Sequence, residues 1–104
     1  MPNIRIKGAD KGLVQSYALK ISELSRLLNC SEDKIFIIDE GRKTIYADAK
    51  VKNPVYVVVE WKQRRDKEQL LSQHLTEHFQ DYSNSVRVTF RDIDTQWYIN
   101  GIKS

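Results

Sequence analysis

The sequence predicts an α+β fold made of a duplicated β-α-β unit, with a four-stranded mixed sheet and two helices on one of its faces. The first observation is that a strand-like segment follows a proline twice, at Pro2 and at Pro54. The second is that a segment with helical periodicity and then another strand-like segment follow in each half. We therefore expect residues 1–104 to form one domain with two structural repeats, at about 2–40 and 54–93.

The first half begins with the alternating segment 3–7, which is typical of a strand with one buried face. Asp10 is a suitable N-cap for the helix that follows, and Asn29 is a suitable C-terminal stop. The apolar residues between them recur at steps of three and four, as in a helix with one apolar stripe: Val14, Tyr17, Ala18, Ile21, Leu24 and Leu28. The continuous apolar run 35–38 predicts a strand buried on both faces.

In the second half, segment 55–61 is the strongest strand, and its lack of alternation predicts a central place in the sheet. Asp66 and Gln69 have the spacing of a capping box, at the start of a helix that we expect to reach about Asp81. The alternating segment 86–90 then closes this half. Two shorter strands are predicted at 44–47 and, at an edge of the sheet, at 97–99.

The composition limits the classes of protein to which the chain can belong. No apolar run approaches the roughly 20 residues needed to cross a membrane, and no secretory signal is evident at the start. A single cysteine, Cys30, suggests a reducing cytoplasm. The formal net charge of +3 suits a small anionic ligand without requiring a nucleic acid. The predicted strands place a set of cations on the sheet face opposite the helices, namely Arg5, Lys7, Arg87 and Arg91.

Pro2 is the main candidate for chemistry. Proline has no backbone N–H to give to a sheet, so it is tolerated at the first position of a strand. If Met1 is removed, the Pro2 nitrogen becomes a free secondary amine at a position that the fold sets. Such an amine is a candidate base or nucleophile.

A β-α-β repeat of this size with proline at the second position resembles the tautomerase superfamily. That group includes the 4-oxalocrotonate tautomerases and macrophage migration inhibitory factor. The similarity in layout covers nearly the whole chain and suggests an uncharacterised bacterial branch. It implies a homotrimer and an N-terminal proline that moves a proton between carbons next to a carbonyl group. We expect the same chemistry of Pro2, on a small anionic keto or enol substrate and without a cofactor or metal, provided that Met1 is removed.

The resemblance also implies substrate-binding residues. Segment 85–88 is similar to the strand that carries a substrate-binding arginine in 4-oxalocrotonate tautomerases, which points to Arg87, and Lys7 is a second candidate cation. Trp97 and Tyr98 lie where family members place an aromatic residue beside the proline. The arginine that the family carries early in the first helix region is absent here, so substrate identity does not transfer. Each of these residues can also have a purely structural role. The charged ones can be solvated or face another subunit, and the aromatic ones can pack at an edge or between subunits.

The motif His74-Leu75-Thr76-Glu77-His78 matches the inverted zinc-peptidase pattern H-x-x-E-H on a predicted helix. Its two histidines share one face, as two zinc ligands require. Five-residue motifs with three fixed positions also arise by chance, and no third ligand is evident. We therefore expect both histidines to border the core.

Two other classes of protein remain open. The order β-α-β-β-α-β also describes ferredoxin-like domains, many of which bind RNA or small molecules on an open sheet. No segment matches the aromatic-rich signature of RNA-recognition domains, however, so nucleic acid is not the expected partner. A trimeric scaffold that keeps the tautomerase fold without its chemistry is the third possibility. Strand order distinguishes the tautomerase fold from the ferredoxin-like fold. The tautomerase unit has two adjacent parallel pairs of strands, whereas the ferredoxin-like unit has interleaved antiparallel strands.

Overall fold

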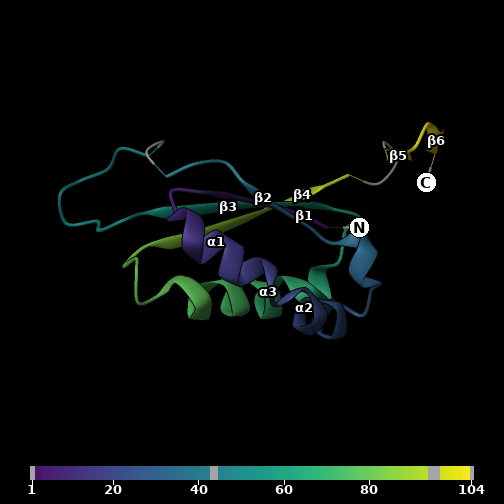
Figure 1. Cartoon of the computed structure of the whole chain (residues 1–104), viewed down its shortest axis with the longest axis horizontal. Coiled ribbons are helices and arrows are strands. Elements are labelled where there is room, and N and C mark those ends of the chain that lie inside the picture. The colour runs from purple at the N-terminus through teal and green to yellow at the C-terminus, as the bar shows by residue number, and fades with distance from the viewer. Residues whose placement is uncertain (1, 43–44, 94–96, 104) are drawn as a thin grey trace.

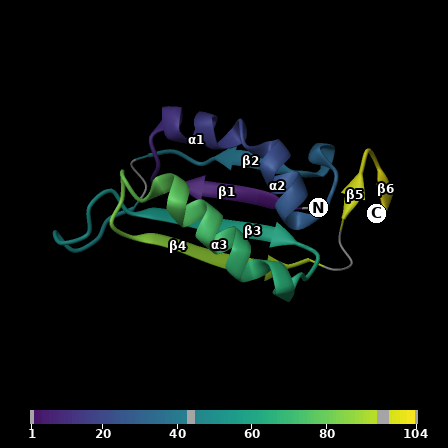
Figure 2. The same ribbon diagram turned by 90° about the horizontal axis from the view of Figure 1, so that it is seen from below.

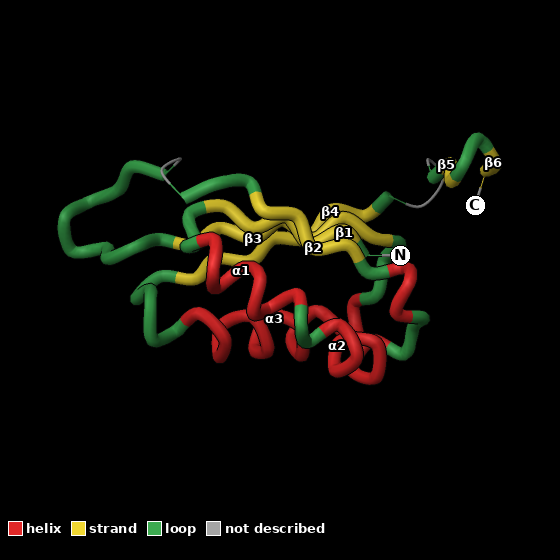
Figure 3. Tube along the Cα trace, viewed as in Figure 1, coloured by secondary structure: helices red, strands yellow, loops and turns green. Residues whose placement is uncertain are grey.

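The structure is a computed structural model of the chain and describes residues 2–42, 45–93 and 97–103. A sheet and a layer of helices lie one above the other, and a small hairpin projects beyond one end of the sheet (Figures 1 and 3). The elements follow in the order β1 (Asn3–Lys7), α1 (Lys11–Ala18), α2 (Ile21–Leu28), η1 (Glu32–Lys34), β2 (Phe36–Asp39), β3 (Val55–Trp61), α3 (Arg65–Phe79), β4 (Val86–Asp92), β5 (Tyr98–Ile99) and β6 (Ile102–Lys103).

The four longer strands form one mixed sheet in the order β2-β1-β3-β4. β1 is parallel to β2 and β3 is parallel to β4, whereas the two central strands, β1 and β3, are antiparallel. This arrangement confirms the predicted α+β class and the two adjacent parallel pairs. It excludes the ferredoxin-like alternative, whose strands are interleaved.

The two central strands owe their place to their apolar residues. In β1, Ile4 and Ile6 are fully buried, while Asn3, Arg5 and Lys7, which alternate with them, are half-buried. In β3 the residues on the helix side are buried, and on the other side Val58 is only 8% exposed. A strand that is apolar on both faces is stable only inside a sheet, so the central place predicted for 55–61 is confirmed.

The helices all lie on one face of the sheet. Figure 2 shows α3 crossing β3 and β4, with α1 and α2 on the side of β1 and β2. The single helix predicted in the first half is two helices. Leu19 and Lys20 donate to the carbonyl groups three residues earlier, and this tighter turn interrupts the helix between α1 and α2.

The helix ends agree with the sequence in part. Asp10 is the N-cap of α1 by position, although its side chain caps no backbone N–H, and Asn29 ends α2 in the left-handed conformation with φ 52°. The capping box predicted at Asp66 is wrong. The N-cap of α3 is Arg64, no side chain caps it, and the helix ends at Phe79 rather than near residue 81.

Three strand predictions also need correction. The run 35–38 is not buried on both faces, because β2 is an edge strand and Phe36 is 61% exposed. Residues 45–47 form no strand, and Thr44 lies outside the described residues. Tyr98–Ile99 does not extend the sheet, because β5 pairs with β6 in a separate hairpin.

The core lies between the sheet and the helices. Its largest fully buried side chains come from β1, β3 and all three α-helices: Ile4, Ile6, Tyr17, Leu24, Leu28, Val55, Val57, Val59, Trp61, Leu71, Leu75 and Phe79. Burying a side chain of this size stabilises a fold by about 1.5–3 kcal/mol. Among the described residues, no helix is both long and apolar enough to cross a membrane.

Candidate active site

Pro2 directly precedes β1 and is buried. Its carbonyl oxygen accepts a hydrogen bond from the backbone N–H of Phe36, at 3.1 Å. The next residue, Asn3, is in register with Phe36 on one side and with Glu60 on the other. Pro2 is therefore held at the end of a central strand, between the start of β2 and the end of β3.

A hollow of about 440 Å³ lies at the start of β2, between η1 and the hairpin. It is lined by Asp33, Lys34, Phe36, Trp97, Tyr98, Ile99 and Asn100. The start of β1 lies at the same end of the molecule as this hairpin (Figures 1 and 2). The two aromatic residues expected beside the proline, Trp97 and Tyr98, thus share a hollow with Phe36, whose backbone is bonded to Pro2.

Trp97 holds the hairpin in place rather than offering a free donor. Its indole N–H donates to the carbonyl oxygen of Ile93, at 2.7 Å. The N–H of Ile93 in turn donates to the carbonyl oxygen of Trp61 at the end of β3, also at 2.7 Å. The Trp97 side chain therefore contributes ring surface to the hollow, while the Tyr98 side chain remains 65% exposed.

Lys7 and Arg87 lie at the other end of the sheet. Lys7 is in register with Tyr56, and Tyr56 with Arg87, so the three residues form a row across β1, β3 and β4. Lys7 lies five positions after Pro2 along the strand, which corresponds to about 16 Å. A single copy of the chain does not bring these two predicted cations to Pro2.

A second hollow, of about 220 Å³, adjoins Arg87. Its lining is mostly apolar, with the side chains of Tyr46, Tyr56, Ser85 and Arg87 as polar groups. Among the described residues, no carboxylate pairs with Lys7 or Arg87. The charges at this end of the sheet are therefore available to an anion or to another molecule.

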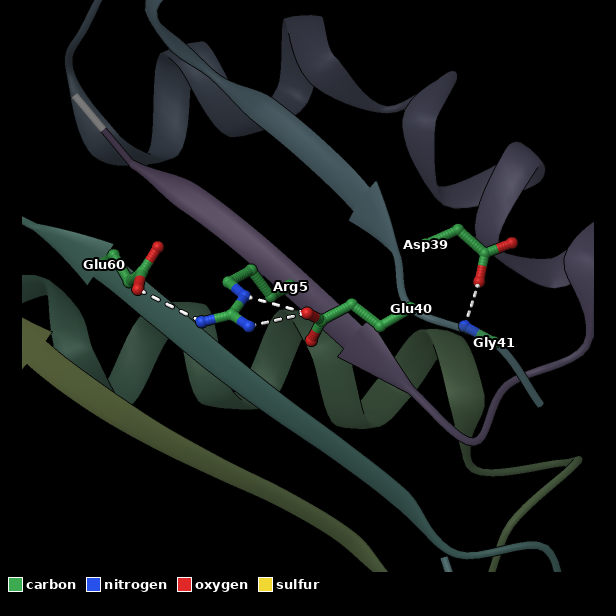
Figure 4. Close-up of polar contacts among 5 residues, drawn as sticks. All are labelled: Arg5, Asp39, Glu40, Gly41 and Glu60. Atoms are coloured by element: carbon green, nitrogen blue, oxygen red, sulfur yellow. Dashed lines mark hydrogen bonds and ion pairs between the residues drawn. The ribbon is translucent and has the colours of Figure 1, made fainter. Parts of the chain in front are cut away.

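Arg5 differs from the other predicted cations because it is paired (Figure 4). Its Nε and Nη2 donate to Glu40 Oε2 at 3.0 and 2.6 Å, and its Nη1 donates to Glu60 Oε2 at 3.2 Å. The hydrogen bonds that Arg5 donates to Glu40, and the negative charge of Glu40, raise the pKa of Arg5. The middle of the open sheet face thus carries two carboxylates around one guanidinium, and the face is not uniformly basic.

The two histidines of the H-x-x-E-H motif lie on α3 and bond to groups of the helix layer. His74 contacts Tyr17 and Glu23, and His78 contacts Ser16 and the Leu13 carbonyl. Among the described residues, no three His, Cys, Asp or Glu side chains form a group that could hold a metal ion. The expectation that both histidines border the core is confirmed by their burial, which is intermediate.

Lys34 and Phe36 were missed by the sequence analysis. Lys34 supplies the cation in the hollow that Phe36 lines, and Phe36 supplies both an aromatic face and the backbone N–H that donates to the Pro2 carbonyl oxygen. Phe36 carries a weak sequence signal, because an aromatic residue at the start of a strand is common. The parallel pairing of β1 with β2 brings Phe36 next to Pro2, and Lys34 lies two residues before Phe36.

The fold is that of macrophage migration inhibitory factor and the tautomerases. A macrophage migration inhibitory factor homologue from Prochlorococcus marinus matches with a TM-score of 0.73 and 18% identity, over 97% of each chain. A malonate semialdehyde decarboxylase matches with a TM-score of 0.67 and 10% identity, over 93% of this chain and 89% of its own. At these identities the likeness concerns the fold alone, and it confirms the architecture predicted from the repeat.

The chain belongs to the family described as "Domain of unknown function (DUF1904)", whose model matches residues 1–103. A solved DUF1904 domain from Sebaldella termitidis ATCC 33386 is similar to it, with a TM-score of 0.82 and 24% identity over 100% of both chains. No curated protein matches the sequence. The chain thus lies in an uncharacterised branch with structural neighbours among the tautomerases.

Proposed function

We propose that the protein is an isomerase of the keto–enol tautomerase type, with the Pro2 amine as general base once Met1 has been removed. The observation that supports it most is that Pro2 lies at the same end of the molecule as an aromatic hollow. Pro2 is fixed at the end of β1 by its bond to Phe36, and Phe36 lines that hollow with Trp97 and Tyr98. A base held in one place by a rigid sheet meets the first requirement of proton transfer, which is geometry.

The proposed reaction moves one proton and consumes nothing. The neutral Pro2 amine takes a proton from the carbon next to the carbonyl group, and the electrons of the broken C–H bond form an enolate. The protonated amine then returns the proton to another atom of the conjugated system, which gives the isomer and restores the base. A base of this kind works best when its pKa lies near the working pH, and burial of an amine lowers its pKa.

We infer that the substrate is a small anionic carbonyl compound. Lys34 lies in the hollow that Phe36 lines and can pair with a carboxylate of the substrate. Cations near the reacting carbon also stabilise the negative charge of the enolate. Lys34 can serve this purpose within one copy of the chain.

Lys7 and Arg87 join the Pro2 site only if another copy of the chain supplies them, because within one copy they lie at the far end of the sheet. The homotrimer implied by the family resemblance offers such an arrangement. One further observation favours contact between copies through the open face. Glu40 Oε1 is buried on that face and accepts no hydrogen bond from a described residue, so a donor from another copy would stabilise it.

A trimeric scaffold without the chemistry is the second candidate. The burial of Pro2 favours it, because a substrate has to reach the Pro2 nitrogen. An RNA-binding sheet is a weaker alternative. Arg5, at the centre of the open face, is already paired with Glu40 and Glu60 and is not free to bind phosphate.

We place the protein in the cytoplasm, on the evidence of its cysteine content. Cys30 is the one cysteine of the chain, and its thiol is free and half-buried. A protein that works in an oxidising compartment more often carries paired cysteines.

The test is the rate at which the purified protein tautomerises a simple enol acid, compared with the rate of Pro2→Ala. Mass spectrometry establishes whether Met1 is present in each preparation. We expect Pro2→Ala to lower kcat/KM by about 10²–10⁴-fold, the usual contribution of a general base. A preparation that retains Met1 is the matched control, and it should be equally inactive because its Pro2 nitrogen is an amide. Equal rates for the Met1-free protein and Pro2→Ala would refute the catalytic proposal and leave the scaffold.

A further inference from the structure

The hollow of about 220 Å³ beside Arg87, which we call the Arg87 hollow, lies next to the second proline of the repeat. Pro54 directly precedes β3 as Pro2 directly precedes β1, and the hollow lies where β3 and β4 begin side by side. The Pro54 nitrogen is part of a peptide bond and cannot act as a base. This hollow can therefore offer a ligand binding but no proton transfer of its own.

The Arg87 hollow is built within one copy of the chain. The loop between β2 and β3 supplies part of its lining, and Asn84 holds the end of that loop against the turn before β4. The Asn84 side chain accepts from the Lys52 N–H at 2.8 Å and donates to the Lys50 carbonyl oxygen at 2.9 Å. The backbone N–H of Asn84 also donates to the Lys52 carbonyl oxygen, at 3.2 Å. With the loop held in this way, a ligand meets a site that is largely formed beforehand.

The Arg87 hollow combines apolar walls with a single charge. Ile45, Val51, Pro54 and Val55 supply most of the apolar surface. Among the described residues that line the hollow, Arg87 carries the one charge, and no described carboxylate pairs with it. Arg87 is exposed, so its charge lies on the solvent side of the hollow. An apolar space with one cation at its edge suits a ligand that has one negative group and an apolar body.

The volume of the hollow limits the size of that body. A water molecule takes up about 30 Å³ in the liquid, so about 220 Å³ accommodates roughly seven non-hydrogen atoms. A compact aliphatic group fits this space. A second carboxylate would lie against the apolar walls without a partner, which is unfavourable for a charged group.

We propose that the substrate is a monocarboxylate with a compact aliphatic body, whose carboxylate pairs with Arg87 and whose body fills the Arg87 hollow. This class of substrate presupposes the proposed function, in which Arg87 of one copy joins the Pro2 site of another. Lys34 then serves to stabilise the enolate rather than to bind a second carboxylate. The choice among anionic carbonyl compounds is thus made in the second repeat, away from the base.

Equilibrium binding of unreactive probes tests this class of substrate separately from catalysis. The probes are 3-methylbutanoate, the neutral 3-methylbutanamide and malonate, which have equal numbers of non-hydrogen atoms. Binding to the whole protein at neutral pH is followed by the NMR shifts of the backbone N–H groups of Ser85 and Arg87. We expect 3-methylbutanoate to bind about tenfold more tightly than either other probe, because the amide lacks the charge and malonate lacks the apolar body. Arg87→Ala should weaken the binding of 3-methylbutanoate by about tenfold.

Two lysine substitutions in the loop form a matched pair. Ala47 lines the hollow and Ala49 does not, and both residues are exposed, so neither substitution disturbs the core. Ala47→Lys places a second cation at the hollow and should tighten the binding of malonate by about fivefold, as an exposed ion pair can. Ala49→Lys adds the same charge nearby and should leave malonate binding unchanged.

Two results would overturn the proposal. One is malonate binding as tight as that of 3-methylbutanoate, and the other is equally tight binding of the neutral amide. Pro2→Ala should bind all three probes as the natural protein does, because Pro2 does not line the hollow. Failure of the proposed function is seen separately, in equal tautomerisation rates for Pro2→Ala and the Met1-free protein. An active protein that prefers malonate would refute the substrate class alone.

Discussion

The two ends of the sheet carry different parts of the proposed chemistry. The Pro2 end has a fixed proline, a hollow lined by aromatic residues and one lysine. The Arg87 end has an arginine and a lysine that pair with no described carboxylate, beside a smaller hollow. The Pro2 end therefore carries the proposed base, and the Arg87 end carries groups that can bind an anion.

This difference shows that one strand can carry both a base and a cation without placing them in the same site. β1 starts beside Pro2 and ends at Lys7, so its length keeps the base and the cation apart. Lys34 can supply a cation within one copy, but Lys7 and Arg87 join the Pro2 site only if several copies assemble. The predictions below address the ends separately, from the largest expected effect to the smallest.

Of the variants considered, Gly8→Ala, at the Arg87 end of the sheet, should lose the most stability. Gly8 follows β1 with φ +90°, and an added Cβ would collide with the carbonyl oxygen of Pro54. We expect the free energy of unfolding to fall by roughly 2–4 kcal/mol, measured by urea denaturation.

Gly101→Ala is the matched control at the other end. Gly101 has φ +81° in the hairpin turn, but nothing lies within 4 Å of an added Cβ. Only backbone strain remains, so the loss should be about 1 kcal/mol. If the two variants lose the same stability, the close approach of Gly8 to Pro54 does not affect the free energy of unfolding.

Arg87→Ala should weaken substrate binding. The loss of one charge-assisted hydrogen bond corresponds to about 1.5–3 kcal/mol, so KM for an enol acid should rise by about 10- to 100-fold with a smaller change in kcat. Arg91→Ala is the control, since Arg91 lies four residues further along β4 but does not line the hollow. An equal rise in KM for both variants would mean that only the net charge matters.

Lys34→Ala should have the smallest effect. Lys34 is exposed, and exposed ion pairs contribute up to about 1 kcal/mol, so KM should rise by no more than about fivefold. The rise should shrink as salt is added, because screening weakens an exposed pair. Lys11→Ala, at an exposed lysine of α1 outside the hollow, should leave KM unchanged. A Lys34 effect that salt does not alter would speak against an ionic contact.

Much of the fold could be predicted because local patterns and burial agree. The alternation in 3–7 and the apolar run in 55–61 are properties of the strands themselves, and both strands form as expected. The run 35–38 is equally apolar but lies at an edge, and its own residues hold no information about its neighbours. The break between α1 and α2 was also missed, because no glycine or proline marks it.

The candidate site was harder to predict because it depends on contacts between distant segments. Pro2, Trp97 and Tyr98 were expected to lie together, and the structure places them at the same end of the molecule. Arg87 was grouped with them because segment 85–88 is similar to a strand of the family, and Lys7 because cations suit an anionic substrate. Their distance from Pro2 follows from strand length and register, which the residue types do not determine.

The central claim is that the two ends of the sheet, from different copies, make one site. Pro2→Ala and Arg87→Ala, each expected to have a lower kcat/KM than the natural protein, are unfolded together in equal amounts and refolded as a mixture. Random assembly gives about a quarter of the sites an intact Pro2 from one copy and an intact Arg87 from its neighbour. We predict that kcat/KM of the mixture recovers to about a quarter of that of the natural protein, measured with the same enol acid. A mixture that shows only the average of the two separate variants would contradict the claim.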